Sequence, residues 1–336
     1  MLLSIVVPVY NEEENIANFY KAVTDVMSGL TYDYELIFVD DGSSDSSAMI
    51  LREIAFNDKH VKVLLLARNF GHQTALTCGL DYAHGDAVIT MDGDMQHPPA
   101  LIPELVRLWE SGYDVVRTIR DSTDDASWAK SFTSKYYYKL MNKMADVPIV
   151  EGGSDFRLMN SKALGTLKRF REHGRFLRGI VGVLGYRQAE LHFVAPPRFA
   201  GVSKFSVRKM IRFALDGVTA FSRVPLRAAL YVGVLCGGMS FLLILHLLYV
   251  YLTGQALNGW TTLGVSILFI GGIQLVGLGI IGEYVGRIFE EVKQRPLYWV
   301  KSAINFEEHE EAPLLGPSSA DVFMAPEAYT NKSKED

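Results

Sequence analysis

The sequence predicts an α/β fold in which helices cover a mostly parallel sheet, followed by two membrane-spanning helices. Three observations lead to this prediction. Apolar runs alternate with helical patterns along roughly the first third of the 336 residues. Polar side chains follow four successive apolar runs. Two later stretches lack charged residues over a length that suits a bilayer.

The alternation gives the order of the expected elements in the sheet domain. Strands are expected at residues 3–9, 34–39, 61–66, 87–91 and 114–118. Helices are expected between them, at residues 12–28, 44–56, 74–83 and 101–109. Strands that alternate with helical patterns indicate β-α-β units, and therefore a parallel sheet.

Ligand-type side chains follow the first four expected strands. They are Asn11 and Glu12, then Asp40, Asp41 and Ser43, then Arg68 and Asn69, and finally Asp92 and Asp94. Helix capping explains some of them, since Asp and Ser are good N-caps. It does not explain all four groups, so we expect one extended polar site along the carboxyl edge of the sheet.

Asp92-Gly93-Asp94 directly follows an apolar run and is the most informative of these groups. Alternation along a strand would put both carboxylates on one face. Two hard oxygen ligands at such an edge suit Mg²⁺ or Mn²⁺ bound between protein and substrate phosphates. A polar turn without a metal is the alternative. No G-x-G-x-x-G follows the first strand and no P-loop occurs, which disfavours dehydrogenases and P-loop NTPases.

The two uncharged stretches, at about residues 228–252 and 261–282, are each long enough to cross a hydrocarbon core of about 30 Å. Buried core helices are the alternative. Basic residues flank the pair on both outer sides: Lys204, Arg208, Lys209, Arg212, Arg223, Arg227, Arg287, Lys293 and Arg295. The positive-inside rule therefore places both termini in the cytoplasm and the short connector outside, as in a multi-pass inner (plasma) membrane protein.

Charge is distributed unevenly. The formal net charge is −5, but residues 307–336 contribute −6, and this acidic tail is expected to be disordered. Basic residues gather next to the first span, where anionic lipid would attract them. Their position, without a nucleic-acid motif, makes nucleic-acid binding a poor explanation. Two cysteines exclude a disulfide framework.

Five regions are expected along the chain. Residues 1–204 form the catalytic domain and 205–225 an amphipathic interfacial helix beside the membrane. Residues 226–283 hold both spans, 284–306 form a cytoplasmic C-terminal segment, and 307–336 form the tail. Gly271, Gly272, Gly277 and Gly279 would allow close helix approach, either within one chain or in a homo-oligomer.

Three segments carry a family resemblance. Residues 8–12 (PVYNE), 39–45 (VDDGSSD) and 92–99 (DGDMQHPP) resemble signature segments of inverting family-2 glycosyltransferases with a GT-A, Rossmann-like fold. Further segments, together with the two spans, narrow the resemblance to one subgroup of that family. They are residues 68–71, 153–159, 282–287 and 295–298. The chain resembles polyprenyl-phosphate glycosyltransferases of the bactoprenol glucosyltransferase subgroup, which are related to dolichol-phosphate mannose synthases. The likeness extends over roughly residues 2–300.

The resemblance implies roles for particular residues. Nucleotide-sugar contacts fall on Pro8, Tyr10, Glu12, Asp40, Asp41, Arg68 and Asp92. Asp94, helped by Gln96, would coordinate the metal. Asp155 joins Asp92 and Asp94 as a catalytic residue near the acceptor, as a base or an orienting group. The acceptor phosphate would meet Arg120, Arg157, Arg198, Ser203 and Lys204, the last three in or beside the family's acceptor loop.

Orientation is the preferred role for Asp155, because a phosphate monoester has its second pKa near about 6 and is largely a dianionic nucleophile at neutral pH. The expected reaction is transfer of a sugar, glucose from UDP-glucose, to undecaprenyl phosphate with inversion, at the cytoplasmic face. The lipid-linked sugar would then pass to a flippase for modification of a surface glycan. Galactose, N-acetylglucosamine, mannose or aminoarabinose are alternative donors. A non-catalytic nucleotide-sugar-binding scaffold is the alternative from another class.

Overall fold

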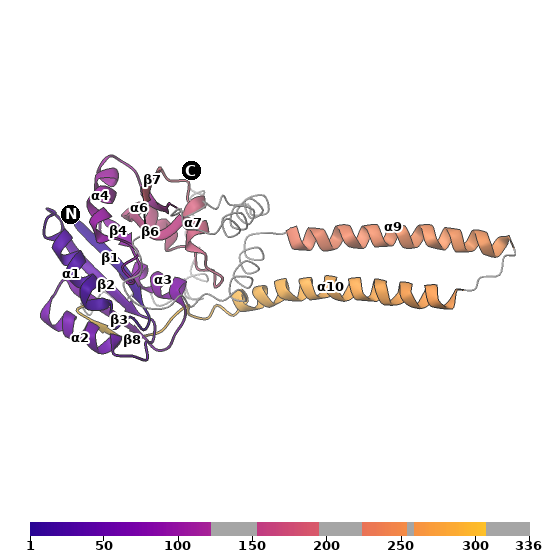
Figure 1. The fold of residues 1–336 in the computed structure, drawn as a ribbon, viewed down its shortest axis with the longest axis horizontal. Helices are drawn as coiled ribbons and strands as arrows, with labels where there is room; N and C mark the ends of the chain where they lie inside the picture. Colours follow the sequence, from indigo (N-terminus) through magenta and orange to yellow (C-terminus); the bar gives the residue numbers. More distant parts are fainter. Residues whose placement is uncertain (122–152, 195–223, 254–258, 307–336) are drawn as a thin grey trace, which may run out of the picture. The chain divides into compact units, whose positions relative to one another are not determined.

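The structure is a computed structural model that describes residues 1–121, 153–194, 224–253 and 259–306 (Figure 1). The chain divides into two compact units. The first contains residues 1–126, 151–202 and 296–336, and the second contains residues 127–150 and 203–295. The first unit is the sheet domain, and the second contains both long apolar helices.

An eight-stranded sheet organises the first unit. Its strands are β1 (Leu2–Val9), β2 (Asp33–Asp40), β3 (Val61–Leu66), β4 (Ala87–Thr90), β5 (Val115–Arg120), β6 (Gly153–Asn160), β7 (Gln188–Phe193) and β8 (Val300–Ile304). The strand order is β7-β5-β6-β4-β1-β2-β3-β8. The pairs β1–β2, β2–β3 and β1–β4 are parallel, whereas β6 runs antiparallel to both β4 and β5. Strand β7 is parallel to β5, and β8 is antiparallel to β3.

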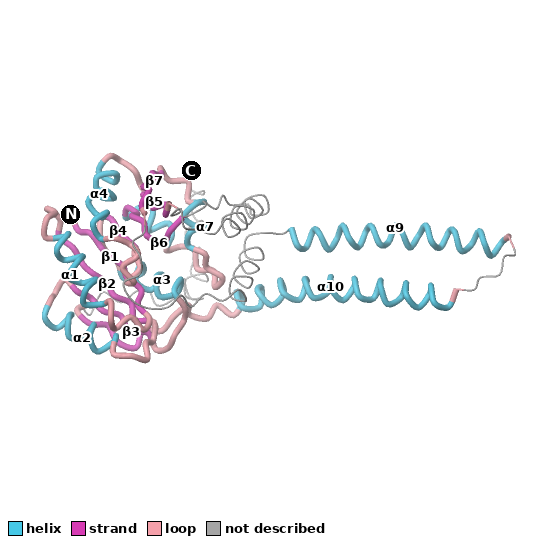
Figure 2. Tube along the Cα trace, in the orientation of Figure 1, coloured by secondary structure: helices cyan, strands magenta, loops and turns pink. Residues whose placement is uncertain are grey.

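Helices pack on both faces of this sheet (Figure 2). Buried side chains of α1 (Ile16–Met27), α2 (Ser47–Asn57) and α4 (Ile102–Glu110), which follows the 3₁₀ turn η1 (Pro99–Leu101), form one core. Those of α3 (His72–Tyr82), α6 (Ser161–Leu167) and α7 (Leu177–Val183) form the other. Alternation along β1 serves both cores, since Ile5 and Val7 face the first and Val6 the second.

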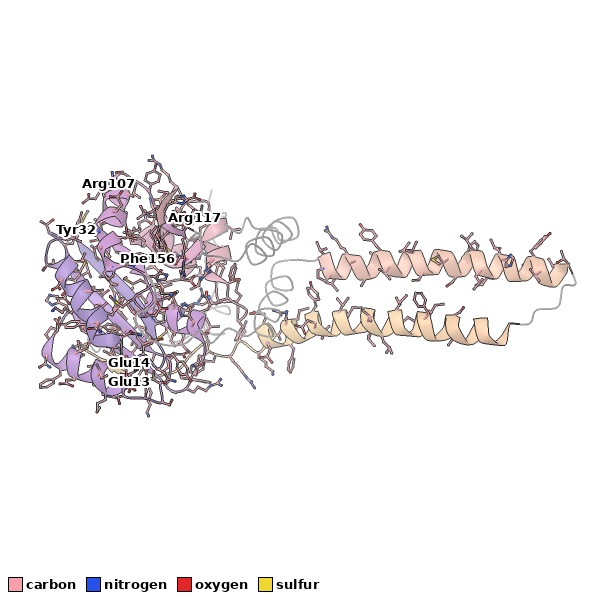
Figure 3. All side chains as sticks on the ribbon, viewed as in Figure 1. Glu13, Glu14, Tyr32, Arg107, Arg117 and Phe156 are labelled. Atoms are coloured by element: carbon pink, nitrogen blue, oxygen red, sulfur yellow. The ribbon has the colours of Figure 1, made fainter. Side chains whose placement is uncertain are left out.

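Local sequence patterns account for these elements. The buried side chains of α1 are Ile16, Phe19, Val23 and Met27, which recur at helical spacing. Phe156 of β6 is buried in the interior of the sheet domain (Figure 3). The expected α/β class is confirmed, and so are the five expected strands and four expected helices, with ends shifted by a few residues. Strands β6 to β8 and helices α6 and α7 were not expected.

The second unit contains α9 (Val224–Leu252) and α10 (Trp260–Val292), which contact each other. Within them, Val224–Val250 and Phe269–Val292 are long and apolar enough to cross a membrane, with mean hydropathies of 2.2 and 1.5. Large apolar side chains along both helices, such as Leu230 and Leu275, are exposed. Both helices are longer than the expected spans. The expected interfacial helix at residues 205–225 lies almost entirely outside the described residues.

The segment after α10 departs from the expected division of the chain. Residues 284–306 were expected to form a separate region. Instead α10 continues to Val292, and β8 then pairs with β3 at the edge of the sheet. The sheet domain therefore includes residues from beyond the second apolar helix, because the unpaired edge of β3 accepts another strand.

Candidate active site

The candidate site lies at the carboxyl ends of β1, β2 and β4. The chain places β2 and β3 on one side of β1 and β4 on the other, so the strand order reverses beside β1. A backbone hydrogen bond from Met91 N to Val6 O is 3.1 Å long and lies at the end of the β1–β4 pairing. Open α/β sheets bind ligands in the crevice at such a switch point.

The loop that follows β4 is held in a tight turn. Gln96 N donates to Asp94 Oδ1 at 3.1 Å, and Asp92 N donates to His97 Nδ1 at 2.8 Å. Met95 between them has a φ of 62°, which is uncommon for a residue with a Cβ. The Asp92 side chain is 33% exposed and Asp94 is half-buried. Both carboxylates therefore remain accessible while the backbone is fixed.

His97 fixes this loop as a neutral side chain. Its Nδ1 accepts the Asp92 amide, so the ring proton lies on Nε2, which is 2.7 Å from Ser154 Oγ. Burial lowers the pKa of His97, and this outweighs the charges of Asp92 and Asp94. The ring also stacks on Phe156, with centroids 5.2 Å apart. His97 thus joins the loop that carries Asp92 and Asp94 to β6, and it does so as a neutral side chain.

Asp155 is the most buried carboxylate of the site, with 2% of the residue exposed. Arg157 donates to its Oδ1 at 2.8 Å, and Arg178 donates Nε to Oδ1 at 3.0 Å and Nη2 to Oδ2 at 2.9 Å. Gln73 Nε2 also donates to Oδ2, at 3.1 Å. Burial alone would raise the pKa of Asp155, but His72 and the two arginines hold it well below its usual range. Asp155 is a firmly ionised anchor for cations.

His72 bridges the two key carboxylates. Its Nε2 is 3.4 Å from Asp92 Oδ1 and 3.6 Å from Asp155 Oδ2, and 44% of its side chain is exposed. It is the first residue of α3, where the helix dipole adds positive potential. Burial would lower the pKa of His72, but Asp155 and Asp92 outweigh this effect and raise it. A solvent-facing imidazole whose protonated form is favoured by both carboxylates therefore lies between Asp92 and Asp155.

Asp40 and Asp41 mainly organise backbone. Both are 3% exposed, and burial raises the pKa of each. Asp41 accepts from Phe70 N at 2.7 Å and from Gly71 N at 2.9 Å. Asp40 accepts longer contacts, of 3.3 and 3.4 Å, from Ser43 N. These carboxylates hold the loops that follow β2 and β3, since their oxygens face amides, and their expected contact with the nucleotide stays a prediction.

The other expected nucleotide contacts differ in exposure. Pro8 is buried in β1, so its ring is not presented to a ligand. Tyr10 is 42% exposed and available. Glu12 is half-buried and accepts from Asn15 Nδ2 at 2.6 Å. Arg68 is exposed, with its guanidinium 4.6 Å from the centre of the Phe70 ring. Tyr10 and Arg68 are thus the exposed positions of the set, and Asp92 is partly exposed.

The side chains expected to bind the acceptor phosphate also differ in exposure. Arg120 is exposed, and its Nη1 lies 3.5 Å from Gln96 Oε1. Arg157 is 3% exposed and donates to Asp155, Ser154 O and Leu177 O, so its guanidinium lies among buried partners, and its expected contact with the acceptor phosphate stays a prediction. Its position on β6, two residues after Asp155, explains this, because alternate residues share one face. Arg198, Ser203 and Lys204 lie outside the described residues.

Sequence reasoning missed His72, Gln73, His97 and Arg178. His97 follows the Asp92-Gly93-Asp94 motif closely, so its place in the motif was a usable signal. His72 and Gln73 begin the helix directly after residues 68–71, a segment that contributes to the family resemblance. Arg178 has no local signal. It reaches Asp155 because α7 folds back over β6, 23 residues further along the chain.

A metal ion fits this donor set only with help from a ligand. In the part of the chain that the structure describes, no group of three or more His, Cys, Asp and Glu side chains is arranged to hold a metal ion. Asp92 and Asp94 nevertheless leave accessible oxygens, and Mg²⁺ or Mn²⁺ often takes one or two carboxylates plus phosphates and water. Gln96 fits less well, because its Oε1 already faces the Arg120 guanidinium.

Gly42 allows the close approach of two loops at the site. Its φ is +69°, and a Cβ there would lie 2.6 Å from the carbonyl carbon of Arg68. We expect Gly42→Ala to lower the free energy of unfolding by roughly 1–3 kcal/mol, measured by denaturant unfolding. Gly185→Ala is the matched control, since Gly185 has a φ of +72° with nothing near the added Cβ. Equal losses in both variants would contradict a role for the close approach.

Comparison with known proteins places the chain in a family. The Glycosyl transferase family 2 profile matches residues 4–167. The chain is 43% identical to the uncharacterized glycosyltransferase YkcC of Bacillus subtilis (strain 168), over 90% of this chain and 94% of that protein. It is 41% identical to the SfII prophage-derived bactoprenol glucosyl transferase of Shigella flexneri, over 90% of this chain and 98% of that protein.

Among solved structures, mannosyl-3-phosphoglycerate synthase from Rubrobacter xylanophilus is similar with a TM-score of 0.48 and 16% identity, over 66% of this chain and 72% of that one. The curated relatives are far closer in sequence. At 41–43% identity over nearly their whole length, they show that the chain belongs to glycosyl transferase family 2.

Proposed function

We propose that this protein is a membrane-anchored glucosyltransferase that moves glucose from UDP-glucose to undecaprenyl phosphate, with inversion at the anomeric carbon. One observation carries the proposal: relatives named bactoprenol glucosyl transferase are 39–41% identical to it over 98–99% of their length. Donor and acceptor are taken from those names and from the family resemblance. The site is compatible with this reaction, since it combines accessible carboxylates with cations at a switch point.

The two apolar helices support a location at the inner membrane. The acceptor lipid cannot leave the bilayer, whereas the sugar donor is soluble, so the reaction requires a catalytic domain held beside a membrane. Both flanks of the helix pair are basic, and the connector carries no charge. By the positive-inside rule we place the catalytic domain and both termini in the cytoplasm.

Asp94 and Asp92 would hold a divalent metal, Mg²⁺ or Mn²⁺, together with the diphosphate of the donor. When bound, this ion neutralises the charge that develops on the departing nucleoside diphosphate. The chain supplies the rigidity of the ligand loop. His97 and the turn at Met95 keep Asp92 and Asp94 facing the crevice before a substrate arrives.

The acceptor phosphate is already a good nucleophile. Its dianion predominates above about pH 6, so no residue needs to remove a proton from it. Asp155 is poorly suited to such a task, because its oxygens accept bonds from Arg157, Arg178 and Gln73. We assign Asp155 to orienting Arg178 and His72, the half-exposed basic side chains that would meet the negative charge of the two substrates.

A donor panel tests the proposal. Purified full-length protein is incubated with Mg²⁺ or Mn²⁺, undecaprenyl phosphate and one radiolabelled nucleotide-sugar at a time, and lipid-linked label is extracted. UDP-glucose is expected to label the lipid, and EDTA is expected to abolish the label. Label from UDP-galactose or UDP-N-acetylglucosamine instead would keep the reaction and change the donor. Release of free glucose that does not depend on undecaprenyl phosphate would contradict the proposed acceptor.

A further inference from the structure

The chain beyond the second apolar helix is attached to the catalytic sheet. We call residues 296–306 the C-terminal strap. Its strand β8 pairs with β3, and Trp299 O accepts a hydrogen bond of 2.9 Å from Ala67 N. Asn305 Nδ2 donates to Ala55 O at 2.6 Å and to Val61 O at 2.8 Å. Lys293, Gln294 and Arg295 alone separate the strap from the end of α10.

The strap also holds the last turn of α3. Tyr298 Oη donates to Asp81 Oδ2 at 2.8 Å, and Arg171 Nη1 donates to the same oxygen at 2.6 Å. The Asp81 side chain is only 2% exposed. Phe306 packs edge-on against Tyr82, with ring centroids 5.2 Å apart. A buried carboxylate with two donors is a costly contact to break, so the end of α3 is firmly tied to the strap.

The opposite end of α3 carries active-site residues. Gln73 Nε2 donates to Asp155 Oδ2 at 3.1 Å, while Gln73 Oε1 accepts from Leu177 N at 3.1 Å. His72 lies between Asp92 and Asp155. Gln73 therefore joins Asp155 to the start of α7, the helix that carries Arg178.

Helix α3 is packed so closely that its two ends are coupled. All residues from Ala75 to Tyr82 are buried. A Cβ at Gly79 would lie 2.3 Å from Val6 Cγ1 and 2.9 Å from Val39 Cγ2, so the helix backbone rests directly on β1 and β2. Closely packed elements move as units and do not deform continuously. Close packing of this kind transmits a displacement at Asp81 along the helix toward His72.

We propose that the C-terminal strap positions α3 for catalysis, and that Tyr298 and Asp81 are positioning residues that act on the reaction through His72 and Gln73. Neither residue touches a substrate in this assignment. The strap follows α10 after three residues. The contacts of Tyr298 and Asp81 therefore join the segment that follows α10 to α3, the helix that carries His72 and Gln73. The activity test of this inference rests on the proposed function, because it measures transfer of glucose to undecaprenyl phosphate.

The test uses full-length Tyr298→Phe, which removes one hydroxyl and keeps the ring. We expect kcat for lipid-linked glucose to fall about fivefold to tenfold, with the KM for UDP-glucose changed by less than about twofold, because Tyr10 and Arg68, the exposed positions expected to contact the nucleotide, lie outside α3. Tyr20→Phe is the matched control. Tyr20 Oη donates to Asp58 Oδ2 at 2.9 Å, between α1 and the turn after α2, without contact to α3. This control is expected to keep its kcat.

A double-mutant cycle separates positioning from general stability. Gln73 and Asp81 are eight residues apart on one helix, or about 12 Å, a distance at which independent effects normally add. If the strap acts through Gln73, Tyr298→Phe will lower kcat by less than about twofold in a Gln73→Ala background. Full additivity, or an equal kcat loss in Tyr20→Phe, would overturn the proposal.

Hydrogen exchange gives a readout that needs no substrate. Tyr298→Phe is expected to speed exchange of the Thr74, Ala75 and Leu177 amides, at the far end of α3 and in α7, more than Tyr20→Phe does. Unchanged exchange there would count against the strap whatever the enzyme's substrate proves to be. A wild-type protein without lipid-linked product would count against the proposed function alone. Asp81→Asn provides a second variant, with the same expected results, if Tyr298→Phe does not fold.

Discussion

Asp94→Asn is expected to lower turnover by about 100-fold to 1,000-fold while the protein stays folded. The substitution keeps an oxygen that can accept the Gln96 amide, so the turn seen between Asp94 and Gln96 persists. It removes the negative charge with which this loop would hold a divalent ion, and loss of that charge stabilisation is worth several kcal/mol in the transition state. The measurement is kcat with UDP-glucose and undecaprenyl phosphate at saturating Mn²⁺, together with the thermal midpoint.

Asp25→Asn is the control for this prediction. Asp25 is an exposed aspartate of α1, and its replacement removes the same charge without touching the site. Its turnover is expected to match wild type. Retained turnover in Asp94→Asn, or an equal loss in Asp25→Asn, would show that the loop after β4 does not hold the catalytic metal. Restoration by high metal concentration would instead support a weakened site.

The elements found correctly from the sequence are those with local patterns. The first four strands and helices alternate and are joined by short connections. The spacing of their apolar residues and the polar residues at the strand ends were therefore enough to place them. Strand β6 gives no such signal, since it enters between β4 and β5 in the antiparallel direction. Strand β8 pairs with β3 across more than 230 residues of sequence, and two apolar helices intervene. A pairing between strands so far apart in the sequence depends on which edge of the folded sheet remains unpaired, and no local sequence pattern indicates that.

The same distinction holds within the site. Asp92, Asp94 and Asp155 could be named from motifs, because short segments carry them. The surroundings of Asp155 could not, since Arg178 and Gln73 reach it from two other helices. Arg157 is the exception that the sequence could have placed: it lies two residues from Asp155 on one strand, so both share a face and pair. The expectation that it contacts the acceptor phosphate did not take this pairing into account.

Asp155→Ala is expected to lower the free energy of unfolding by about 3–5 kcal/mol, because it leaves the Arg157 guanidinium buried without its partner. The Arg157 side chain is 4% exposed and the Asp155 side chain 3%. The pKa of Asp155 is depressed in the folded protein, so its contribution is complete above the unfolded value of about 3.9 and is lost only as pH falls through the folded value. Denaturant unfolding at pH 6 and pH 8 should therefore give the same loss from the Arg157 pairing, while the loss of the His72 pairing, whose pKa Asp155 raises, should make the total loss larger at pH 6.

Asp155→Asn separates the two roles considered for this residue. It keeps the shape of the side chain and removes its charge, so Arg178 loses its bidentate anchor. In the orienting role, kcat falls about 10-fold to 100-fold, and the loss does not shrink as pH rises, because Asp155 also raises the pKa of His72. Arg178→Lys then shows a loss of similar size, since lysine cannot reproduce the paired contact.

A general base would behave differently. Its absence matters most when the acceptor phosphate still carries a proton, and least above about pH 6, where the dianion predominates. The defect of Asp155→Asn would then shrink as pH rises from 5.5 to 8, and Arg178→Lys would keep most of its activity. The structure favours the first pattern, because Asp155 already accepts bonds from Arg157, Arg178 and Gln73. A defect in Asp155→Asn that shrinks as pH rises would reverse the assignment.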